Sequence, residues 1–417
     1  MAVFKTSIVG VIIVILIWRI LTLGFAEHYS RYDDNDDIAK ALSWDSAFPP
    51  ALFKQSRWVE KQDPAKAEAL LIKSIEGDPT NALAYAKLAE WVEARKRGGE
   101  AETLMNRASD LAPLQIPVQL AAGAFWMRQG RLDAALAHWD VVLARRSSLR
   151  SQLYPVLLAL VSTPQAAAPF AHLLQDNIPS WWTSFFVYAV RSAPSLDEVR
   201  LLYRWRRVNQ QPISREERRT VIERLEKEGQ WLEAYFVWLN NLDKQQSGAL
   251  GNLYNGSFEL PLSNEDFDWR TPGVRGVQVG TAVTAGAEGE KAVRLEFQDT
   301  PVRFQHLYQH LVLSSGHYQL QGFLKLDSLQ AKQGLQWQLK CLQAKSGILL
   351  GNSERFMGST SWQPFSFDFE VPATECPAQE LKLVLVGRFP DDFKVKGTAW
   401  FDAMSIRRVK LKSPRYP

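Results

Sequence analysis

The feature that most limits the fold of this chain is a set of three alanines at a constant spacing. Ala67, Ala101 and Ala135 lie 34 residues apart, an interval typical of repeated pairs of antiparallel helices. Large apolar residues follow each alanine by four positions, and residues that favour a helix end follow by twelve. In chain order these are Leu71, Met105 and Trp139, and then Pro79, Pro113 and Ser147. The spacing predicts stacked helical hairpins, because small side chains let two helices approach closely.

Other positions repeat in the first helix of each predicted pair. They are Leu88 and Ala122, Ala89 and Gly123, and Val92 and Trp126. The pattern resembles tetratricopeptide repeats, and this resemblance implies a surface that docks protein partners in its groove. We assign residues 38–147 to such repeats. Residues 148–244 drift from the consensus, with a late return at Gly229, Ala234 and Trp238, and we interpret them as degenerate helical repeats.

The N-terminus is strongly apolar. The runs Ile8–Trp18 and Ile20–Ala26, separated by Arg19, approach the length of about 20 residues that crosses a bilayer as a helix. Lys5 precedes the runs and acidic residues follow them, which favours a cytoplasmic N-terminus, with Arg19 extended toward the outer interface. We predict a membrane anchor at 1–28 and an acidic linker at 29–37; a signal peptide cleaved after Gly24-Phe25-Ala26 is the alternative.

Composition excludes some classes of protein and restricts others. With 417 residues the chain is long enough for two or three domains. Its net charge of +4 lacks the strongly basic character of nucleic-acid-binding proteins, so no nucleic-acid partner is expected. The two cysteines, Cys341 and Cys376, lie in strand-like sequence. We expect a disulfide between them in an oxidising compartment, and two buried thiols are the alternative.

The pattern changes from helical to period two in the last part of the chain. Residues 245–252 are rich in Gln, Ser and Gly and predict a linker. Residues 317–324, 335–341, 365–369 and 381–385 alternate apolar and polar side chains, which indicates antiparallel strands. Residues 253–410 are therefore expected to form a β-sandwich of the jelly-roll type. We expect Trp337 and Trp400 in its core, and Trp362 fits either the core or the surface.

The two ends of the sandwich segment carry a further pattern. It opens with Asn-Gly-Ser-Phe-Glu at 255–259 and closes with Gly-Thr-Ala-Trp-Phe-Asp-Ala-Met-Ser-Ile at 397–406. The segment resembles the jelly-roll carbohydrate-binding modules of bacterial polysaccharide-degrading enzymes. The resemblance implies adjacent first and last strands, and a structural calcium ion held by Glu259, Asp402 and the carbonyl of Gly256. Alternatively, the two carboxylates cap loops or pair with Lys or Arg. No other cofactor is expected.

Sugar binding requires an aromatic ring that stacks on a pyranose and polar groups that bind its hydroxyls. The candidates are polar or aromatic residues on the outward faces of the predicted strands. They are Gln319, Gln321, Gln336, Gln338, His306, Tyr308 and His310. The resemblance does not transfer sugar contacts by position, because those of the family occupy no fixed motif, and many such jelly rolls bind no sugar.

A group of arginines on helical sequence forms a second candidate surface. Arg200, Arg204 and Arg207 share one face at helical spacing. Such a patch would attract an anionic polymer or lipid headgroups. The alternative is a solvated face neutralised by neighbouring acids, namely Glu216, Glu217, Glu223 and Glu226.

The order of anchor, repeats and sandwich also resembles a known kind of protein. The stretches Trp337–Cys341, Trp362–Pro372 and Cys376–Gln379 are similar to repeat proteins encoded with bacterial exopolysaccharide-assembly and exosortase systems. This resemblance implies an accessory role in polysaccharide synthesis or export. The compartment that follows is the bacterial inner membrane, crossed once, with the bulk of the chain in the periplasm.

The predicted fold class is a multidomain α-then-β chain: a transmembrane helix, a helical solenoid and an antiparallel sandwich. No enzyme motif of the common kinds is present in the sequence, so we expect a scaffold that docks proteins and contacts a glycan or a second subunit. Alternatives are a glycan-binding lectin, a polysaccharide-active enzyme whose two acids meet only in the fold, and a chaperone-like receptor for secreted polypeptides.

Overall fold

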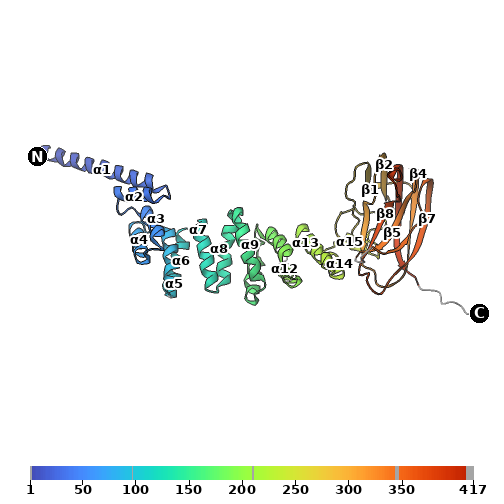
Figure 1. Ribbon diagram of the computed structural model, residues 1–417, viewed down its shortest axis with the longest axis horizontal. Helices are drawn as coiled ribbons and strands as arrows, with labels where there is room; N and C mark the ends of the chain where they lie inside the picture. Colours follow the sequence, from blue (N-terminus) through green and yellow to red (C-terminus); the bar gives the residue numbers. More distant parts are fainter. Residues whose placement is uncertain (1, 96, 209–210, 343–346, 410–417) are drawn as a thin grey trace, which may run out of the picture. The chain divides into compact units, whose positions relative to one another are not determined.

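The computed structural model describes residues 2–95, 97–208, 211–342 and 347–409, with side chains from Gly10 onward. Within these residues 15 α-helices precede nine β-strands in two antiparallel sheets (Figure 1). The predicted α-then-β fold class is confirmed. The chain divides into two compact units, 1–185 with 204–210 and 186–203 with 211–417. The boundary lies among the helices, so the predicted linker at 245–252 does not separate the units.

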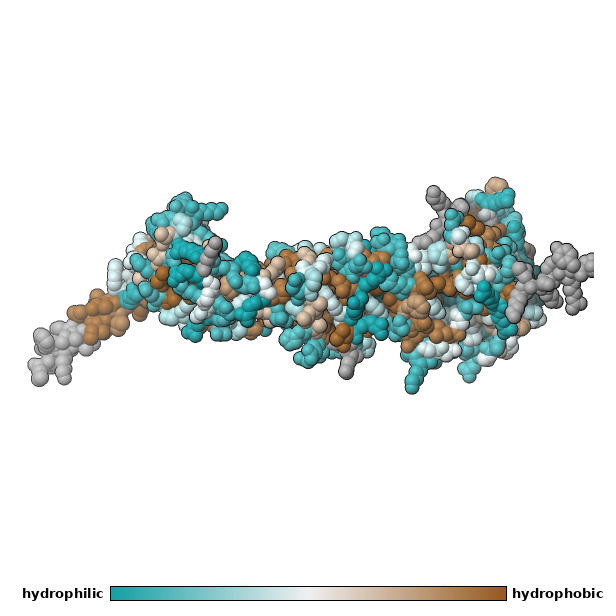
Figure 2. Space-filling model, turned by 90° about the horizontal axis from the view of Figure 1, so that it is seen from below, coloured by the Kyte–Doolittle hydropathy of each residue, from teal (hydrophilic) through white to brown (hydrophobic). Residues whose placement is uncertain are grey.

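The first helix is long and apolar enough to cross a membrane. Helix α1 (Ala2–Ser30) is followed by α2 (Asn35–Trp44) and α3 (Pro49–Val59), and α1 is the brown helix at the left of Figure 2. Its last turns pack on α2 through buried Ala26, Ile38 and Ala41. The predicted linker at 29–37 is mostly helical, because it holds the end of α1 and the start of α2, whose N-terminus is capped by Asp34.

The next helices form hairpins at the predicted interval. Helices α4 (Pro64–Gly77), α6 (Gly98–Leu111) and α8 (Leu132–Arg145) begin 34 residues apart, as do α5 (Ala82–Ala94) and α7 (Ile116–Arg128). Ala67, Ala101 and Ala135 occupy the fourth position of their helices and are fully buried. The repeated spacing therefore reflects equivalent packing positions, where a larger side chain would separate two helices.

The helical pattern continues at a similar interval through the drifted region. First helices begin at Arg150, Trp182 and Arg215, so the helical interval persists where the sequence consensus is lost. The elements are α9 (Arg150–Val161), α10 (Ala167–Gln175), α11 (Trp182–Ser192), α12 (Leu196–Val208), α13 (Arg215–Lys227), α14 (Trp231–Leu239) and α15 (Lys244–Gly248). The short helix α15 occupies half of the predicted linker at 245–252, and Asp243 caps it.

The strands form two antiparallel sheets. The five-stranded sheet has the order β1 (Val277–Val283), β2 (Lys291–Pro301), β9 (Lys394–Arg408), β4 (Gly316–Ala331) and β7 (Gly358–Val371). The four-stranded sheet has the order β3 (Leu307–Leu311), β8 (Gln379–Leu385), β5 (Leu335–Cys341) and β6 (Leu349–Asn352). Neighbouring strands are far apart in the sequence, so each face of a sheet collects residues from distant segments.

Aromatic side chains from both sheets fill the sandwich. Trp337 is buried as predicted, with its ring 5.7 Å from that of Trp269 and 5.3 Å from that of Phe401. A disulfide joins Cys341 at the end of β5 to Cys376 before β8. The predicted end of the domain at 410 lies outside the described residues.

Candidate functional site

The fold divides the seven predicted glycan-binding residues between two opposite faces of the sandwich. Gln319 and Gln321 lie on β4 and alternate with buried Tyr318 and Leu320, so they lie on the outer face of the five-stranded sheet. The other five belong to the four-stranded sheet or precede it. These are Gln336 and Gln338 on β5, Tyr308 and His310 on β3, and His306 just before β3. One ligand cannot contact both sets.

On the outer face of β4 a large apolar side chain is open to solvent. Phe323 is 44% exposed, two residues after Gln321 on the same face. Gln319 Nε2 donates a hydrogen bond to Asp368 Oδ1 at 2.8 Å, whereas Gln321 has no hydrogen-bond partner among the described residues. An exposed phenyl ring beside an amide with free hydrogen-bonding groups is suited to a ligand with an apolar face and hydroxyls.

Trp400 lies at the centre of the same face, which corrects its predicted place in the core. It alternates on β9 with buried Ala399 and Phe401, and it pairs with Arg294 on β2 and with Lys325 on β4. The Arg294 guanidinium lies 5.5 Å and the Lys325 ammonium 5.8 Å from the centre of its ring. Both cations therefore make cation–π contacts with one indole.

We call this set the Phe323 surface; it consists of Gln321, Phe323, Lys325, Arg294 and Trp400. Sequence alternation had already assigned Phe323 to the polar face, but it did not indicate that Arg294 and Trp400 lie beside it. That proximity depends on the strand order β2-β9-β4. The surface combines an exposed ring, an amide and the Lys325 ammonium, with Arg294 paired to Glu296 at 3.0 Å, so it can stack on a sugar ring and attract an anionic substituent through Lys325.

The polar groups of the four-stranded sheet are largely bound to one another. The Lys382 ammonium lies 5.1 Å from the centre of the Tyr308 ring and 2.7 Å from Glu380 Oε1. Gln338 Nε2 donates to Gln336 Oε1 at 3.1 Å, and Gln336 Nε2 donates to the Ser353 carbonyl at 2.8 Å. A ligand on this face would have to replace existing hydrogen bonds, which makes it the less favourable binding surface.

The two predicted histidines lie in different surroundings. His310 packs between the sheet and the helices: its ring lies 5.5 Å from that of Trp231 on α14, and its Nδ1 lies 3.5 Å from Glu226 Oε1 on α13. His310 therefore belongs to a contact between helices and sandwich. His306 lies just before β3, and burial, with a smaller contribution from Lys382, lowers the pKa of His306.

That contact contains charged residues which the sequence did not single out as a site. On α13, Arg215 and Arg218 both pair with Glu265, and Arg218 Nε lies 3.7 Å from Asp266 Oδ2. Burial raises the pKa of Asp266 to about 6, opposed by Arg218 and Arg270. Because α13 and the sandwich belong to one compact unit, these ion pairs join the last hairpin to the sandwich.

The predicted calcium ligands are bound to backbone amides. Glu259 Oε1 accepts hydrogen bonds from the amides of Glu290 and Lys291, and Asp402 Oδ2 accepts one from the Glu288 amide at 2.6 Å. The Gly256 carbonyl accepts from the Met404 amide at 2.9 Å. No group of three His, Cys, Asp or Glu side chains suited to a metal occurs in the described part of the chain. Calcium binding stays a prediction.

The first arginine of the predicted patch, Arg200, is neutralised by acidic side chains. Arg200 donates hydrogen bonds to Glu233 and to Asp197 at 2.8 to 3.3 Å. Its partners are not the four acids that the sequence suggested. Arg204 and Arg207 lie later on α12 and are exposed, and the ion pairs of Arg200 make the patch less basic than the spacing indicated.

Comparisons with known proteins concern the C-terminal part of the chain. The solved structures similar to it include CBM4 (16% identity, TM-score 0.29) and a family 61 module in complex with β-1,4-galactotriose (20%, 0.27), each covering 38% of this chain and 99% of the other. The CBM22-1 xylan-binding domain of Paenibacillus barcinonensis Xyn10C is 16% identical, covering 37% of this chain and 92% of that one, with a TM-score of 0.26.

No protein-family model and no curated protein matched the chain. The tetratricopeptide assignment therefore stays a prediction. The structural neighbours of the C-terminal region are carbohydrate-binding modules. At these identities and TM-scores, the ligands of those modules are not transferred to this chain. A ligand for this chain has to be inferred from its own residues.

Proposed function

We propose that the protein is a membrane-anchored scaffold whose β-sandwich binds a glycan through the Phe323 surface. The observation that supports this most directly is the exposed Phe323 ring beside Gln321, whose amide has no partner among the described residues. Trp400 with its two cations extends the surface across three strands. Anionic glycans fit this surface best, because the Lys325 ammonium flanks the aromatic side chain and has no ion-pair partner among the described residues.

The helical hairpins would supply the second binding activity. Their repeated small residues stack the helices closely, and arrays of this kind expose an extended surface to partner proteins. We propose that partners dock there, while α1 holds the chain in the inner membrane with its bulk in the periplasm. A role in exopolysaccharide assembly or export follows from the resemblance of the whole chain to accessory proteins of those systems.

The sandwich is proposed to bind its glycan without cleaving it. Two acids near the Phe323 surface already have partners: Glu296 pairs with Arg294 at 3.0 Å, and Asp368 accepts from Gln319. Incubation of the full chain with anionic polysaccharides should release no new reducing ends. Release of oligosaccharides that stops in an Asp368→Asn variant would favour a polysaccharide-active enzyme instead.

Glycan binding by the full chain in detergent tests the main proposal. Affinity-gel retardation with acidic and neutral bacterial polysaccharides should detect binding that Phe323→Ala and Gln321→Ala each weaken about tenfold, the usual effect of one stacking or polar contact. The matched control is Gln338→Ala, because Gln338 is also a strand glutamine but lies on the other sheet. Loss of binding in the control alone would assign the glycan to the four-stranded sheet and contradict the proposal.

We also propose a calcium ion beside Asp402. Burial raises the pKa of this carboxyl to about 6, and the nearby Glu288 and Glu259 carboxylates add to the rise, so a cation there would relieve unfavourable negative charge. Millimolar calcium should raise the melting temperature of the wild-type chain, and Asp402→Asn should abolish the increase. Equal shifts in both proteins would rule out this site.

A further inference from the structure

A pocket with a basic lining lies next to the C-terminal end of α1. Its volume is about 510 Å³. It lies in the first compact unit and collects side chains from the segment after α1, from α3 and from α5. The lining residues are Asp33, Lys54, Arg57, Trp58, Glu60, Lys61 and Lys87. With four cations and two carboxylates, the lining carries a positive charge.

Two of the cations are neutralised inside the pocket. The Lys54 ammonium lies 2.8 Å from Asp33 Oδ1 and donates to the Tyr32 carbonyl at 3.1 Å, and the Lys87 ammonium lies 2.9 Å from Glu60 Oε1. Arg57 and Lys61 are exposed and have no ion-pair partner among the described residues. The excess positive charge therefore belongs to one guanidinium and one ammonium at the same opening.

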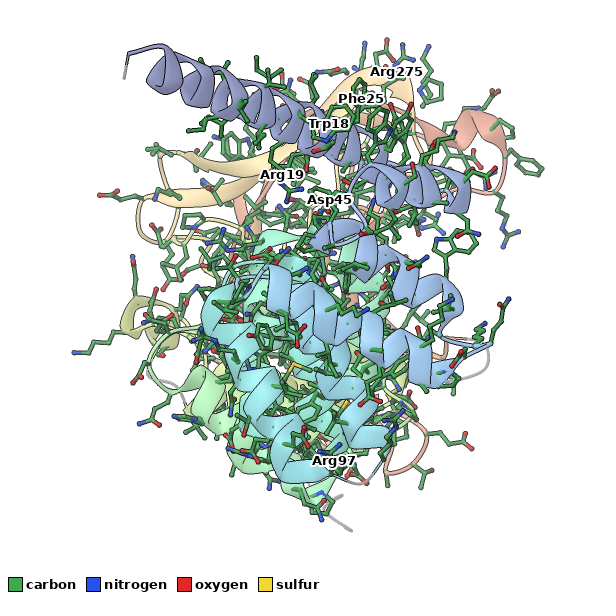
Figure 3. The ribbon with its side chains drawn as sticks, turned by 90° about the vertical axis from the view of Figure 1, so that its left-hand side faces the viewer. Trp18, Arg19, Phe25, Asp45, Arg97 and Arg275 are labelled. Carbon is green, nitrogen blue, oxygen red and sulfur yellow. A yellow bond between two sulfur atoms is a disulfide. The ribbon has the colours of Figure 1, made fainter. Side chains whose placement is uncertain are left out.

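Contacts along α1 determine where this pocket lies relative to the apolar segment. Arg19 on α1 pairs with Asp45 after α2 at 3.1 Å, as Figure 3 shows, and the Phe25 ring stacks on that of Trp44 at 4.6 Å. Along the described side chains of α1, buried residues begin at Thr22, while Val11 to Trp18 are exposed, as are Ile20 and Leu21. A bilayer around α1 would end near these contacts, and Asp33 lies in the short segment just after the helix ends at Ser30.

Exposed aromatic residues occur in the same part of the chain. Trp58 lines the pocket and is 52% exposed, and Tyr32 and Trp44 are also exposed. Amphipathic aromatic rings of this kind are enriched where a protein meets the headgroup region, and basic residues there attract anionic lipids. The pocket therefore combines the two residue types that contact a lipid headgroup.

We propose that this pocket binds the phosphate group of an anionic lipid headgroup, with Arg57 and Lys61 as its main contacts. A guanidinium can bind phosphate oxygens with two parallel hydrogen bonds, and an ammonium adds a third charge-assisted bond. Trp58 would lie against the glycerol and upper acyl region. The site rests on the membrane anchoring in the proposed function, because only an anchored α1 brings the pocket to the lipid surface.

Titration of the full chain in a zwitterionic detergent with short-chain lipids tests the site, with native mass spectrometry counting the bound lipids. Dioctanoyl-phosphatidylglycerol should bind at least tenfold more tightly than dioctanoyl-phosphatidylcholine. The double variant Arg57→Gln/Lys61→Gln should weaken phosphatidylglycerol binding about 30-fold, the effect of removing two cations near anionic headgroups. Asp33→Asn should strengthen binding, because it removes a carboxylate from the lining.

The matched control is Lys73→Gln, which removes an exposed lysine on α4 outside the pocket and should leave lipid affinity unchanged. Equal affinity for both lipids, or full binding by the double variant, would overturn the site. Inorganic phosphate that binds as tightly as phosphatidylglycerol would assign the pocket to a soluble phosphate ligand and overturn the lipid. Alkaline extraction of membranes tests anchoring separately, since its failure leaves the detergent titration interpretable.

Discussion

At the scale of single residues, small side chains mark the places where the helices are closest. Gly123 on α7 faces Trp139 on α8, and a Cβ atom at that position would lie 2.3 Å from the indole ring. Glycine is therefore required there by its neighbour's size rather than by its own backbone conformation. One repeat earlier the equivalent positions hold Ala89 and the narrower Met105, so the two positions vary together to conserve the packed volume.

Gly123→Ala should therefore destabilise the helical unit, although alanine is the better helix former. Displacing the Trp139 ring is expected to cost about 1–3 kcal/mol, measured as a lower urea midpoint by circular dichroism. Gly98→Ala is the control, because a Cβ atom added there would meet no neighbouring atom within 4 Å, and it should be neutral or slightly stabilising. Equal midpoints for the two variants would contradict this packing.

The buried Asp266 predicts a pH dependence of stability. Its pKa is raised from 3.8 to about 6 by burial, so the folded state holds the proton more tightly than the unfolded state. Its contribution to the free energy of unfolding is greatest below pH 3.8 and is lost as the pH rises through about 6.

Between about pH 4 and 7 the wild type should therefore lose on the order of 2 kcal/mol of stability relative to Asp266→Asn, which does not titrate. Thermal melts of both proteins across this range measure the difference. Parallel stability curves would show that the carboxyl is already ionised at the acid end of the range in the folded protein.

At the scale of secondary-structure elements, strand order decides which residues share a surface. The alternation on β4 predicts an outward Phe323 from local sequence alone, but β9 lies beside β4 only because the chain's last strand enters the middle of the sheet. The disulfide also joins separate elements, since it links the end of β5 to the segment before β8 across 35 residues.

Removal of this disulfide should destabilise the sandwich. For a closed loop of this length the chain-entropy estimate is about 3–4 kcal/mol. The variant Cys341→Ser/Cys376→Ser should melt at a lower temperature than the wild type, and dithiothreitol should lower the wild-type transition while leaving that of the variant unchanged. A wild-type melting temperature that dithiothreitol does not change would contradict a stabilising role for the disulfide.

At the level of the whole chain, the sandwich packs against the last helical hairpin within one compact unit. Trp238 on α14 packs at 5.0 Å from the Tyr254 ring and 5.8 Å from the Phe267 ring. Arg218 on α13 pairs with buried Glu265 and Asp266. The last hairpin and the sandwich therefore share one core and one set of ion pairs.

A fragment of residues 253–417 should accordingly be less stable than one of residues 186–417. It exposes Phe267, which costs about 1.5–3 kcal/mol of apolar burial, and it removes Arg218, the ion-pair partner of the Glu265 and Asp266 carboxylates. Arg218→Ala in the full chain should reproduce part of this loss. Denaturant unfolding of the two fragments measures the difference in stability. Equal midpoints would show that the sandwich is as stable alone as it is with the hairpin.

Features that depend on local periodicity can be predicted from the sequence. The 34-residue spacing of Ala67, Ala101 and Ala135 predicts the hairpins, and period-two alternation predicts β4 and β5, because helix and strand geometry repeat over short distances. The three-dimensional fold was needed to show that Gln319 and Gln336 face opposite ways, that Arg19 pairs with Asp45 and that Arg218 pairs with Glu265. Those arrangements join residues from separate elements, and no local period carries information about which elements become neighbours.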